Sequence, residues 1–284
     1  MAFTTLIQAN ELAARLTGTD TLVCDCRFDL ADANAGRRAY GQGHILGAVH
    51  VDLDTVLSGE KTGANGRHPL PDREDFAAVM AGFGLSAASQ VVAYDAAEGM
   101  FAARLWAMLR WLGHANVAVL DGGLAAWTAQ GGALETTPPA PRPRGDLQSG
   151  RSMLPLVDYD AVRAASATGA RPIVDARAAD RFRGENETLD KVGGHIPGAV
   201  SRVFRRNLAE DGRWKPADTL RQEFTELLDG RDPKALIAQC GSGVTACHNL
   251  LAMEIAGLPG AALYPGSWSE WSSRPGSPIA TGSE

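Results

Sequence analysis

An internal duplication constrains this sequence more than any other feature. Four short blocks of the first half recur in the same order in the second half. The pairs are TLVCDCR (21–27) with PIVDAR (172–177), HILGA (44–48) with HIPGA (195–199), VVAYDAAEGM (91–100) with LIAQCGSGV (236–244), and LDGGLAAW (120–127) with YPGSWSEW (264–271). The spacing is kept as well, because His44 follows Asp25 by 19 residues and His195 follows Asp175 by 20. We therefore predict two copies of one domain.

A proline-rich stretch separates the two copies. Residues 136–154 read TTPPAPRPRGDLQSGRSML and hold four of the fifteen prolines of this 284-residue chain. Such a composition is typical of an extended linker. We therefore predict a first domain over residues 1–140, a linker over 141–154 and a second domain over 155–284.

Short apolar runs alternate with helical patterns inside each copy. The runs VVAYD (91–95) and LIAQC (236–240) have the length and composition of buried strands. Apolar residues at helical spacing follow over 101–112 and 245–256, and a glycine comes directly after each of these stretches. Strands that alternate with helices indicate a mostly parallel sheet with helices on both faces. The fold class that we predict is therefore α/β, in two tandem domains.

Charge and composition narrow the classes of partner. The chain has 27 basic and 33 acidic residues, a net charge of −6, and 45% hydrophobic residues. Because it lacks a positive surplus to neutralise phosphates, we expect neither nucleic acid nor an anionic membrane surface as its partner. Its apolar runs are too short to span a bilayer, and its first 20 residues lack the pattern of a secretory signal. We predict a monomeric, cytoplasmic protein.

The four cysteines do not read as a disulfide framework or as a metal site. They are Cys24, Cys26, Cys240 and Cys247. The first two lack the two-residue spacing of zinc and thioredoxin motifs, and no second pair completes a metal site. We therefore predict neither a metal ion nor an organic cofactor.

Cys240 is the strongest candidate for chemistry. It follows a predicted buried strand and precedes the sequence Gly241-Ser242-Gly243-Val244-Thr245, which opens a helix. Ligands tend to bind at the carboxyl ends of the strands in such sheets. Glycines allow positive φ, so we expect the backbone N–H groups of this loop to turn inward and, with the helix N-terminus, to stabilise an anion. We predict a nucleophilic thiolate whose loop also cradles a persulfide or an incoming oxyanion.

The first copy has Asp95 at the position of this cysteine. A carboxylate cannot perform thiolate chemistry, and the segment after it, AAEGMF, contains a single glycine. We therefore predict that the second domain is catalytic and that the first supports it.

These motifs resemble those of the rhodanese family. The matching segments are Tyr40-x-x-x-His44-Ile-Leu-Gly-Ala in the first domain, and His195-Ile-Pro-Gly-Ala, Cys240-Gly-Ser-Gly-Val-Thr-Ala and Gly266-Ser-Trp-Ser-Glu-Trp271 in the second. Two-domain members of this family include thiosulfate and 3-mercaptopyruvate sulfurtransferases. The resemblance implies two tandem rhodanese-like domains and a double displacement. Sulfane sulfur would pass from a small anionic donor to Cys240, as a persulfide, and then to a thiophilic acceptor such as cyanide, a thiol or a protein thiol.

The resemblance also bears on the donor. Thiosulfate-preferring relatives tend to carry basic residues directly after the cysteine, whereas Gly241 and Ser242 match the form of mercaptopyruvate enzymes. Arg181 matches an arginine that binds the donor's anionic group. Mercaptopyruvate enzymes often have a second arginine about nine residues further on, where this chain has only Asp190 and Lys191. The resemblance therefore implies 3-mercaptopyruvate or thiosulfate as donor, with a thiosulfate-preferring rhodanese as the alternative.

A proton relay is a further implication of the resemblance. His68, in the sequence GRHPLP (66–71), matches a histidine that faces the active site in mercaptopyruvate relatives, and Asp54 matches the acid that orients it. Together with Ser242 they would move a proton during sulfur transfer. A loop histidine beside a proline can equally be structural or solvated.

Two other classes of function fit the same fold. Dual-specificity phosphatases share it, but they need an arginine in the loop after the cysteine, and residues 241–247 contain none. The second alternative is a binding or sulfur-carrier module without turnover. Rhodanese-like modules of that kind usually lose the cysteine, so its presence here in a full glycine loop favours an enzyme.

Overall fold

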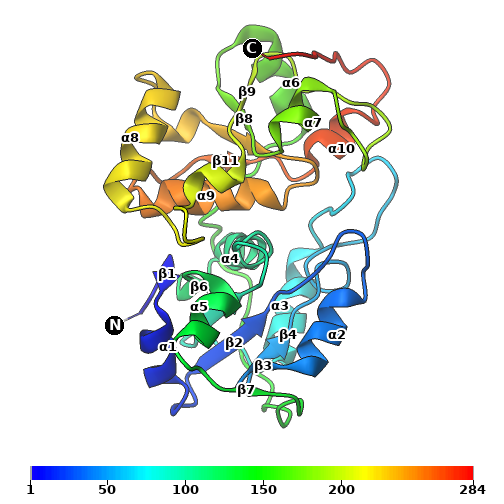
Figure 1. Ribbon diagram of the computed structural model, residues 1–284. Helices are drawn as coiled ribbons and strands as arrows, with labels where there is room; N and C mark the ends of the chain where they lie inside the picture. The colour runs from blue at the N-terminus through cyan, green and yellow to red at the C-terminus, as the bar shows by residue number, and fades with distance from the viewer. Residues whose placement is uncertain (1, 284) are drawn as a thin grey trace. The chain divides into compact units, whose positions relative to one another are not determined.

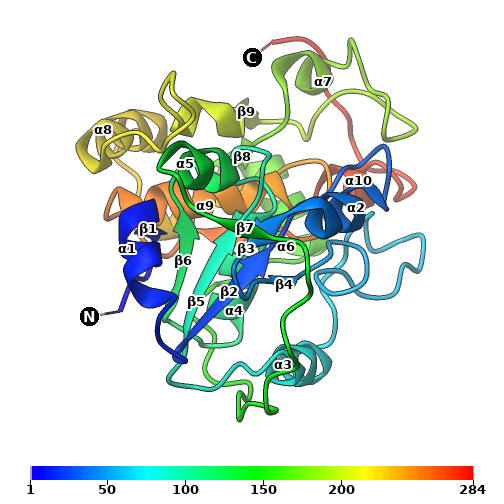
Figure 2. The same ribbon diagram turned by 60° about the horizontal axis from the view of Figure 1, so that its bottom comes forward.

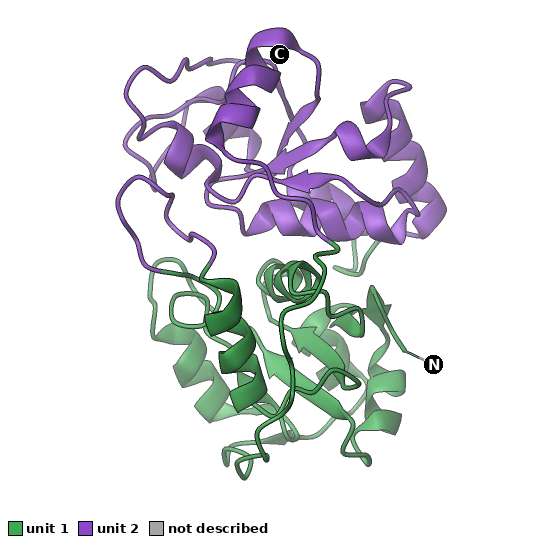
Figure 3. Cartoon of the chain, turned by 180° about the vertical axis from the view of Figure 1, so that it is seen from behind, with its two compact units in different colours: residues 1–59, 71–153, 210–214 green, residues 60–70, 154–209, 215–284 purple. Residues whose placement is uncertain are grey.

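The computed structural model describes residues 2–283 and divides them into two compact units. Within these residues, unit 1 comprises the chain up to residue 59 together with 71–153 and 210–214 (Figure 3). Unit 2 comprises 60–70, 154–209 and the chain from residue 215 onward.

Unit 1 is built on a parallel sheet of five strands in the order β1-β6-β5-β2-β4. These strands are β1 (Leu6–Ile7), β2 (Thr21–Asp25), β4 (Val49–His50), β5 (Gln90–Tyr94) and β6 (Val117–Leu120). An antiparallel pair, β3 (His44–Ile45) and β7 (Leu134–Glu135), accompanies the sheet. The helices of this unit are α1 (Ala9–Arg15), α2 (Ala35–Gln42), α3 (Arg73–Gly82), α4 (Ala102–Trp111) and α5 (Gly123–Ala129). Figure 2 shows the arrows of β6, β5 and β2 side by side.

Unit 2 repeats this plan with a parallel sheet of four strands in the order β11-β10-β8-β9. These strands are β8 (Ile173–Asp175), β9 (Ala199–Ser201), β10 (Ile237–Gln239) and β11 (Ala262–Leu263). The α-helices are α6 (Tyr159–Thr168), α7 (Ala179–Arg183), α8 (Ala217–Leu228), α9 (Thr245–Ile255) and α10 (Ser267–Trp271), and two 3₁₀ turns are η1 (Phe204–Asn207) and η2 (Pro233–Ala235). Helix α9 is orange in Figure 1.

The parallel sheets and their helices confirm the predicted α/β class. The predicted strands at 91–95 and 236–240 correspond to β5 and β10, and the helices predicted at 101–112 and 245–256 correspond to α4 and α9. All five residues of β5 and all three of β10 are buried. Such strands favour a continuous apolar run because helices cover the sheet. None of the helices in residues 2–283 is long and apolar enough to cross a membrane.

Two short segments belong to a different compact unit from the residues around them. Segment 60–70 belongs to unit 2, where the backbone N–H of Arg67 donates to Ser269 Oγ at 2.9 Å. Segment 210–214 belongs to unit 1, where the backbone N–H of Trp214 donates to Asp121 Oδ1 at 3.0 Å. The compact units therefore differ from the predicted domain bounds at these two segments. For segment 60–70 the difference bears on the site, because it carries His68.

The proline-rich stretch follows the surface of unit 1. Residues 141–150 contain no helix or strand, and the backbone N–H groups of Gly145, Leu147 and Gly150 donate to backbone carbonyls of unit 1. Gly145 donates to Ala81 at 2.8 Å, and Gly150 donates to Leu112 at 2.7 Å. Irregular backbone of this kind satisfies its polar groups against a neighbouring surface, which holds the stretch in place without regular structure.

Candidate functional site

Cys240 lies directly after β10, in the loop that leads into α9. The residue is 2% exposed. Its backbone N–H donates to Ser267 Oγ at 3.1 Å, and its carbonyl accepts from the N–H of Trp268 at 3.0 Å. The carbonyl of Gly241 accepts from the N–H of Ser269 at 2.9 Å. These three hydrogen bonds fix the first residues of the loop against α10.

The rest of the loop requires glycine and leaves backbone donors available. Gly243 has φ +78°, and a Cβ at this residue would lie 2.5 Å from the carbonyl oxygen of Pro265. Within the described chain, the backbone N–H groups of Gly241, Ser242 and Val244 donate to no protein acceptor. Thr245 then begins α9. The loop therefore offers several N–H groups at the N-terminus of an 11-residue helix, and such groups can donate hydrogen bonds to an anion.

The corresponding loop of unit 1 already holds an anion, which is its own carboxylate. Asp95 is 1% exposed and follows β5. Its Oδ1 accepts from the N–H groups of Ala97 at 2.8 Å and Gly99 at 2.9 Å. Its Oδ2 accepts from Phe101 and Ala102, both at 2.9 Å. The strand–loop–helix turn that both repeats share thus binds a negative group in the copy that has an aspartate at the position of Cys240.

Two arginines lie over the loop of unit 2. A Cβ on Gly241 would lie 3.1 Å from Arg67 Nη2 and 3.5 Å from Arg181 Nη2. Arg181 makes a two-pronged ion pair with Glu187, at 2.8 and 2.9 Å, and its Nη2 lies 3.4 Å from Asp190 Oδ2. Arg67 Nη1 pairs with Asp190 Oδ1 at 2.6 Å. The cationic groups beside the loop are therefore held by two carboxylates.

Burial and pairing with arginines shift the pKa values of Glu187 and Asp190 in opposite directions. Burial raises the pKa of Glu187, but its hydrogen bonds with Arg181 and with backbone N–H groups outweigh that effect, so the net shift is downward. For Asp190, burial is the largest effect and raises the pKa despite the attraction of Arg67 and Arg181. The environment of Glu187 thus favours its ionised form, whereas burial disfavours the ionised form of Asp190.

Arg177 has a structural environment. It is 3% exposed, pairs with Asp175 at 2.7 Å and lies over the ring of Trp268, 4.7 Å from its centroid. Burial lowers the pKa of Arg177, but Asp175 and Glu187 raise it further than burial lowers it, and Cys240 adds to the rise. Its charge is therefore secured by neighbours and acts on the region of Cys240.

His68 and Ser242 are brought together by the packing of segment 60–70 into unit 2. His68 Nδ1 lies 2.7 Å from Ser242 Oγ, and both residues are buried. Asp54 belongs to unit 1, where its backbone N–H donates to Asp52 Oδ1 at 3.0 Å. The orientation of His68 by Asp54 remains a prediction.

The other cysteines differ from Cys240 in their surroundings. Cys24 lies in β2 and Cys26 directly after it, and burial raises the pKa of both thiols well above the ordinary value of 9.0. Cys247 lies inside α9, where its Sγ donates to the carbonyl of Gly243 at 3.2 Å. All four thiols are free of disulfides. Among residues 2–283, no group of three or more His, Cys, Asp or Glu is arranged to hold a metal ion.

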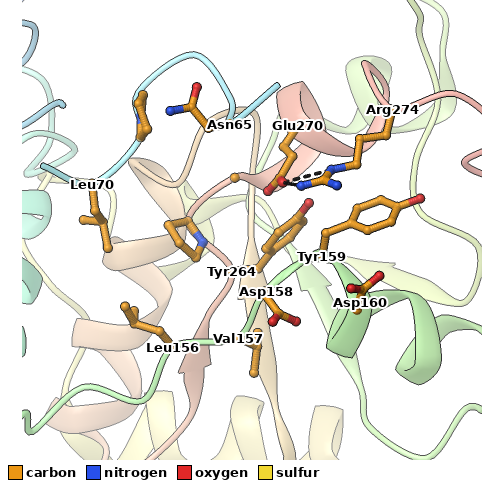
Figure 4. A pocket seen from close by; sticks show the side chains of 13 residues that line it. Asn65, Leu70, Leu156, Val157, Asp158, Tyr159, Asp160, Tyr264, Glu270 and Arg274 are labelled. Carbon is orange, nitrogen blue, oxygen red and sulfur yellow. Dashed lines mark hydrogen bonds and ion pairs between the residues drawn. The ribbon is translucent and has the colours of Figure 1, made fainter. Parts of the chain in front are cut away.

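Two cavities of unit 2 border the segment that carries His68. One has a volume of about 470 Å³, and its lining includes Gly66, Arg67, Asp190 and Lys191. The other, of about 590 Å³, is shown in Figure 4, with Asn65 and Leu70 on one side and Tyr159 and Tyr264 on the other. In this second cavity Arg274 Nε is paired with Glu270 Oε1 at 3.0 Å.

Two residues of the site were missed by reasoning from the sequence. Ser267 has φ +53°, which is rare for a residue other than glycine, and its side chain accepts the hydrogen bond from Cys240. The repeat carries a signal for it, because Gly123 stands at the corresponding position with φ +57°. The second residue is Arg67, whose place over Gly241 depends on contacts distant in the chain, and the sequence gives no local signal for it.

Comparison with known proteins defines the class of this fold and site. A family model described as rhodanese-like domain matches residues 8–130 and 158–274, so the chain belongs to the rhodanese-like family and has two such domains in tandem. This confirms the predicted family and the duplication.

Individual relatives cover nearly the whole chain. A protein of Pseudomonas aeruginosa named probable 3-mercaptopyruvate sulfurtransferase is 49% identical, over 99% of this chain and 100% of the relative. A putative thiosulfate sulfurtransferase of Mycobacterium tuberculosis is 37% identical, over 98% of this chain and 97% of the relative. Among solved structures, the 3-mercaptopyruvate sulfotransferase of Escherichia coli is 32% identical and has a TM-score of 0.81, over 94% of this chain and 99% of that chain.

Proposed function

We propose that the chain is a sulfurtransferase in which Cys240 carries sulfane sulfur from a small anionic donor to a thiophilic acceptor. The observation that carries the proposal is the position of Cys240 at the end of β10, in a loop where the backbone N–H groups of Gly241, Ser242 and Val244 have no acceptor among the described residues and over which two guanidinium groups lie. The relatives named as 3-mercaptopyruvate and thiosulfate sulfurtransferases support the same activity.

The first half of the reaction loads sulfur onto the enzyme. The Cys240 thiolate attacks the sulfur of the donor, an S–S bond forms, and the bond between that sulfur and the rest of the donor breaks. With 3-mercaptopyruvate the electron pair of the broken C–S bond stays on carbon as the enolate of pyruvate, which then takes up a proton. With thiosulfate the pair leaves on sulfite. Each version balances without a separate oxidant or reductant.

The second half returns the enzyme to its resting state. An acceptor such as cyanide, a small thiol or a protein thiol attacks the outer sulfur of the persulfide, and the Cys240 thiolate leaves. The loop N–H groups of residues 241–245 stabilise the negative charge on sulfur in both halves, as the N–H groups of the unit 1 loop stabilise the Asp95 carboxylate.

Proton movement is the role that we assign to Ser242 and His68. Their 2.7 Å contact lets a proton pass between the hydroxyl and the imidazole, and the enolate of pyruvate needs a proton whereas sulfite does not. We propose Asp54 as the residue that orients His68. Because the relay serves the ketoacid reaction, it supports 3-mercaptopyruvate as the preferred donor and leaves thiosulfate as the alternative.

Arg181 is the residue that we propose to bind the anionic group of the donor. Its guanidinium lies 3.5 Å from the Cβ position of Gly241, and a planar fork of this kind suits a carboxylate or a sulfonate. Gly241 has no side chain to separate this cation from the donor. Gly243, Val244 and Thr245 complete the loop as backbone donors.

The remaining assignments concern the state of the protein in the cell. We propose that the protein lies in the cytoplasm, because four cysteines without disulfides suit a reducing compartment. We also propose that it is a monomer. Size-exclusion chromatography with light scattering and cell fractionation test these two assignments.

Mass spectrometry after exposure to donor tests the proposed function. The wild-type protein should gain one sulfur atom on the peptide that contains Cys240, and cyanide should remove it with formation of thiocyanate. Cys240→Ser should abolish both events, whereas Cys247→Ser, seven residues along the same loop and helix, should retain them. Sulfur on another cysteine with Cys240 unmodified would contradict the proposal. Parallel kcat/KM measurements with 3-mercaptopyruvate and thiosulfate decide the preferred donor.

A further inference from the structure

Arg67 and Arg181 reach the same point of the loop from segments far apart in the chain. Arg67 belongs to segment 60–70 and Arg181 to α7. Arg67 Nη2 lies 3.1 Å, and the two Nη atoms of Arg181 lie 3.5 and 3.6 Å, from the position of a Cβ on Gly241. Two like charges converge here, directly after Cys240. Like charges gathered in a partly buried place need an anion to balance them.

Asp190 supplies an anion between these two guanidinium groups. One of its carboxylate oxygens lies 2.6 Å from Arg67 Nη1, and the other lies 3.4 Å from Arg181 Nη2. The aspartate side chain is 8% exposed. Its pKa is raised because burial outweighs the attraction of both arginines. Asp190 is therefore a carboxylate that two arginines hold in a buried position, where it has lost much of its contact with water.

The two arginines are not equally occupied by protein groups. Arg181 is committed to Glu187 through Nε and Nη2. Arg67 Nη1 pairs with Asp190 and also donates to the carbonyl of Leu189 at 3.3 Å, whereas its Nε is a buried donor without a partner within the described residues. Arg67 and Asp190 also line the cavity of about 470 Å³. The pair therefore borders both an open volume and the loop that carries the thiol.

We propose that Arg67 is a second residue for the donor's anionic group, and that Asp190 occupies this anion site when no donor is bound. The proposal rests on the proposed function and assigns the chemical class of ligand, a small carboxylate such as a 2-ketoacid. A donor carboxylate that replaces Asp190 between Arg67 and Arg181 leaves the number of ion pairs unchanged. It also releases Asp190 from burial. Arg67 thus provides a second guanidinium group beside Gly241, in addition to that of Arg181.

Binding of pyruvate tests the site without turnover. Pyruvate has the carboxylate and carbonyl of the donor but no sulfur to transfer, and isothermal titration measures its dissociation constant. Arg67→Gln should weaken pyruvate binding by about tenfold to a hundredfold, the cost of losing a charge-assisted hydrogen bond. Asp190→Asn should tighten it, because the competing carboxylate is gone. Arg183→Gln is the matched control, since Arg183 lies on α7 and pairs with the exposed Glu185.

A double variant separates a direct role of Arg67 from an indirect one. If Arg67 binds the anion itself, Arg67→Gln should still weaken pyruvate binding when Asp190→Asn is already present. If Arg67 only neutralises Asp190, this effect should vanish in the Asp190→Asn background, and the proposal would be wrong. Wild-type pyruvate affinity in the single variant Arg67→Gln would also overturn it. Should that variant fold poorly, Arg67→Lys keeps the charge but loses the fork, and should weaken binding to a lesser degree.

Kinetics distinguish failure of this inference from failure of the proposed function. Arg67→Gln should raise KM for 3-mercaptopyruvate by about tenfold or more while kcat at saturating donor changes little, and the persulfide should still form on Cys240. If Arg67→Gln had the KM of the wild-type protein for 3-mercaptopyruvate, while the wild-type protein formed the persulfide normally, only the role of Arg67 would be refuted. Absence of the persulfide from the wild-type protein with every donor would refute the proposed function itself.

Discussion

Asp95 and Cys240 stand at the same position of the two repeats, each directly after a buried parallel strand and before a helix. In unit 1 the carboxylate of Asp95 accepts four backbone N–H groups of the loop that follows it. In unit 2 the corresponding loop keeps N–H groups without protein acceptors, next to a thiol and two arginines. The same strand–loop–helix turn thus occurs twice, once closed by an internal carboxylate and once with the N–H groups that we propose to bind an external anion.

Replacing that internal carboxylate tests the role of the turn in stability. Asp95→Asn exchanges one oxygen for an NH₂ group, which cannot accept, so two of the four buried N–H groups lose their partner. We expect the free energy of unfolding to fall by about 2–5 kcal/mol, measured by urea denaturation. Asp146→Asn is the control, because Asp146 accepts from the N–H of Ala87 at an exposed position and its loss should cost much less. Equal decreases in the free energy of unfolding for the two variants would show that burial of the Asp95 turn does not increase its contribution to stability.

A side chain at Gly243 should damage both the fold and the loop. Gly243→Ala must keep φ near +78°, which costs about 1–2 kcal/mol, and its Cβ would lie 2.5 Å from the carbonyl of Pro265. Gly276→Ala is the control, because Gly276 has φ +79° and nothing lies within 4 Å of the added Cβ. The difference in melting temperature between the two variants measures the clash. We expect Gly243→Ala alone to lower kcat/KM as well, and identical behaviour of the two variants would contradict the close approach.

The contact between His68 and Ser242 should matter more for one donor than for the other. His68→Ala and Ser242→Ala should each depress turnover of 3-mercaptopyruvate by about tenfold or more and turnover of thiosulfate by less, because only the ketoacid leaves an enolate that needs a proton. Ser242→Thr, which keeps the hydroxyl, should retain most of the 3-mercaptopyruvate turnover that Ser242→Ala loses. Steady-state kinetics with both donors check this, and equal losses on the two donors would mean that the relay is not specific to the ketoacid.

The buried thiols of Cys24, in β2, and Cys26, directly after it, should make stability fall in alkaline solution. Burial raises the pKa of Cys24 and Cys26 well above 9.0, so above pH 9 the unfolded chain releases these protons while the folded chain keeps them. The free energy of unfolding therefore decreases as pH rises through that range, by about 1.4 kcal/mol per pH unit for each thiol. A Cys24→Ala, Cys26→Ala double variant should show a shallower decline from pH 9 to 10.5 in chemical denaturation. The same slope in both proteins would contradict the shift.

Much of this protein was accessible from local patterns in its sequence. The strands that become β5 and β10, the helices that become α4 and α9, and the loop after Cys240 all follow from residues within a few positions of one another, and the repeat follows from comparing such local segments in the two halves of the chain. Apolar runs, helical spacing and glycine positions report such features because they depend on backbone conformation and burial at the residues themselves. The family follows from the same local segments.

The tertiary structure alone decided what surrounds the thiol. Arg67 and Asp190 form an ion pair across 123 positions of sequence, and His68 meets Ser242 across 174. Both contacts exist because segment 60–70 packs against the residues around Gly266 and Ser269, where a Cβ on Gly66 would lie 2.7 Å from the carbonyl of Gly266. No local propensity encodes such a meeting. It arises from the free energy of packing the whole unit, which brings together side chains that the chain keeps far apart.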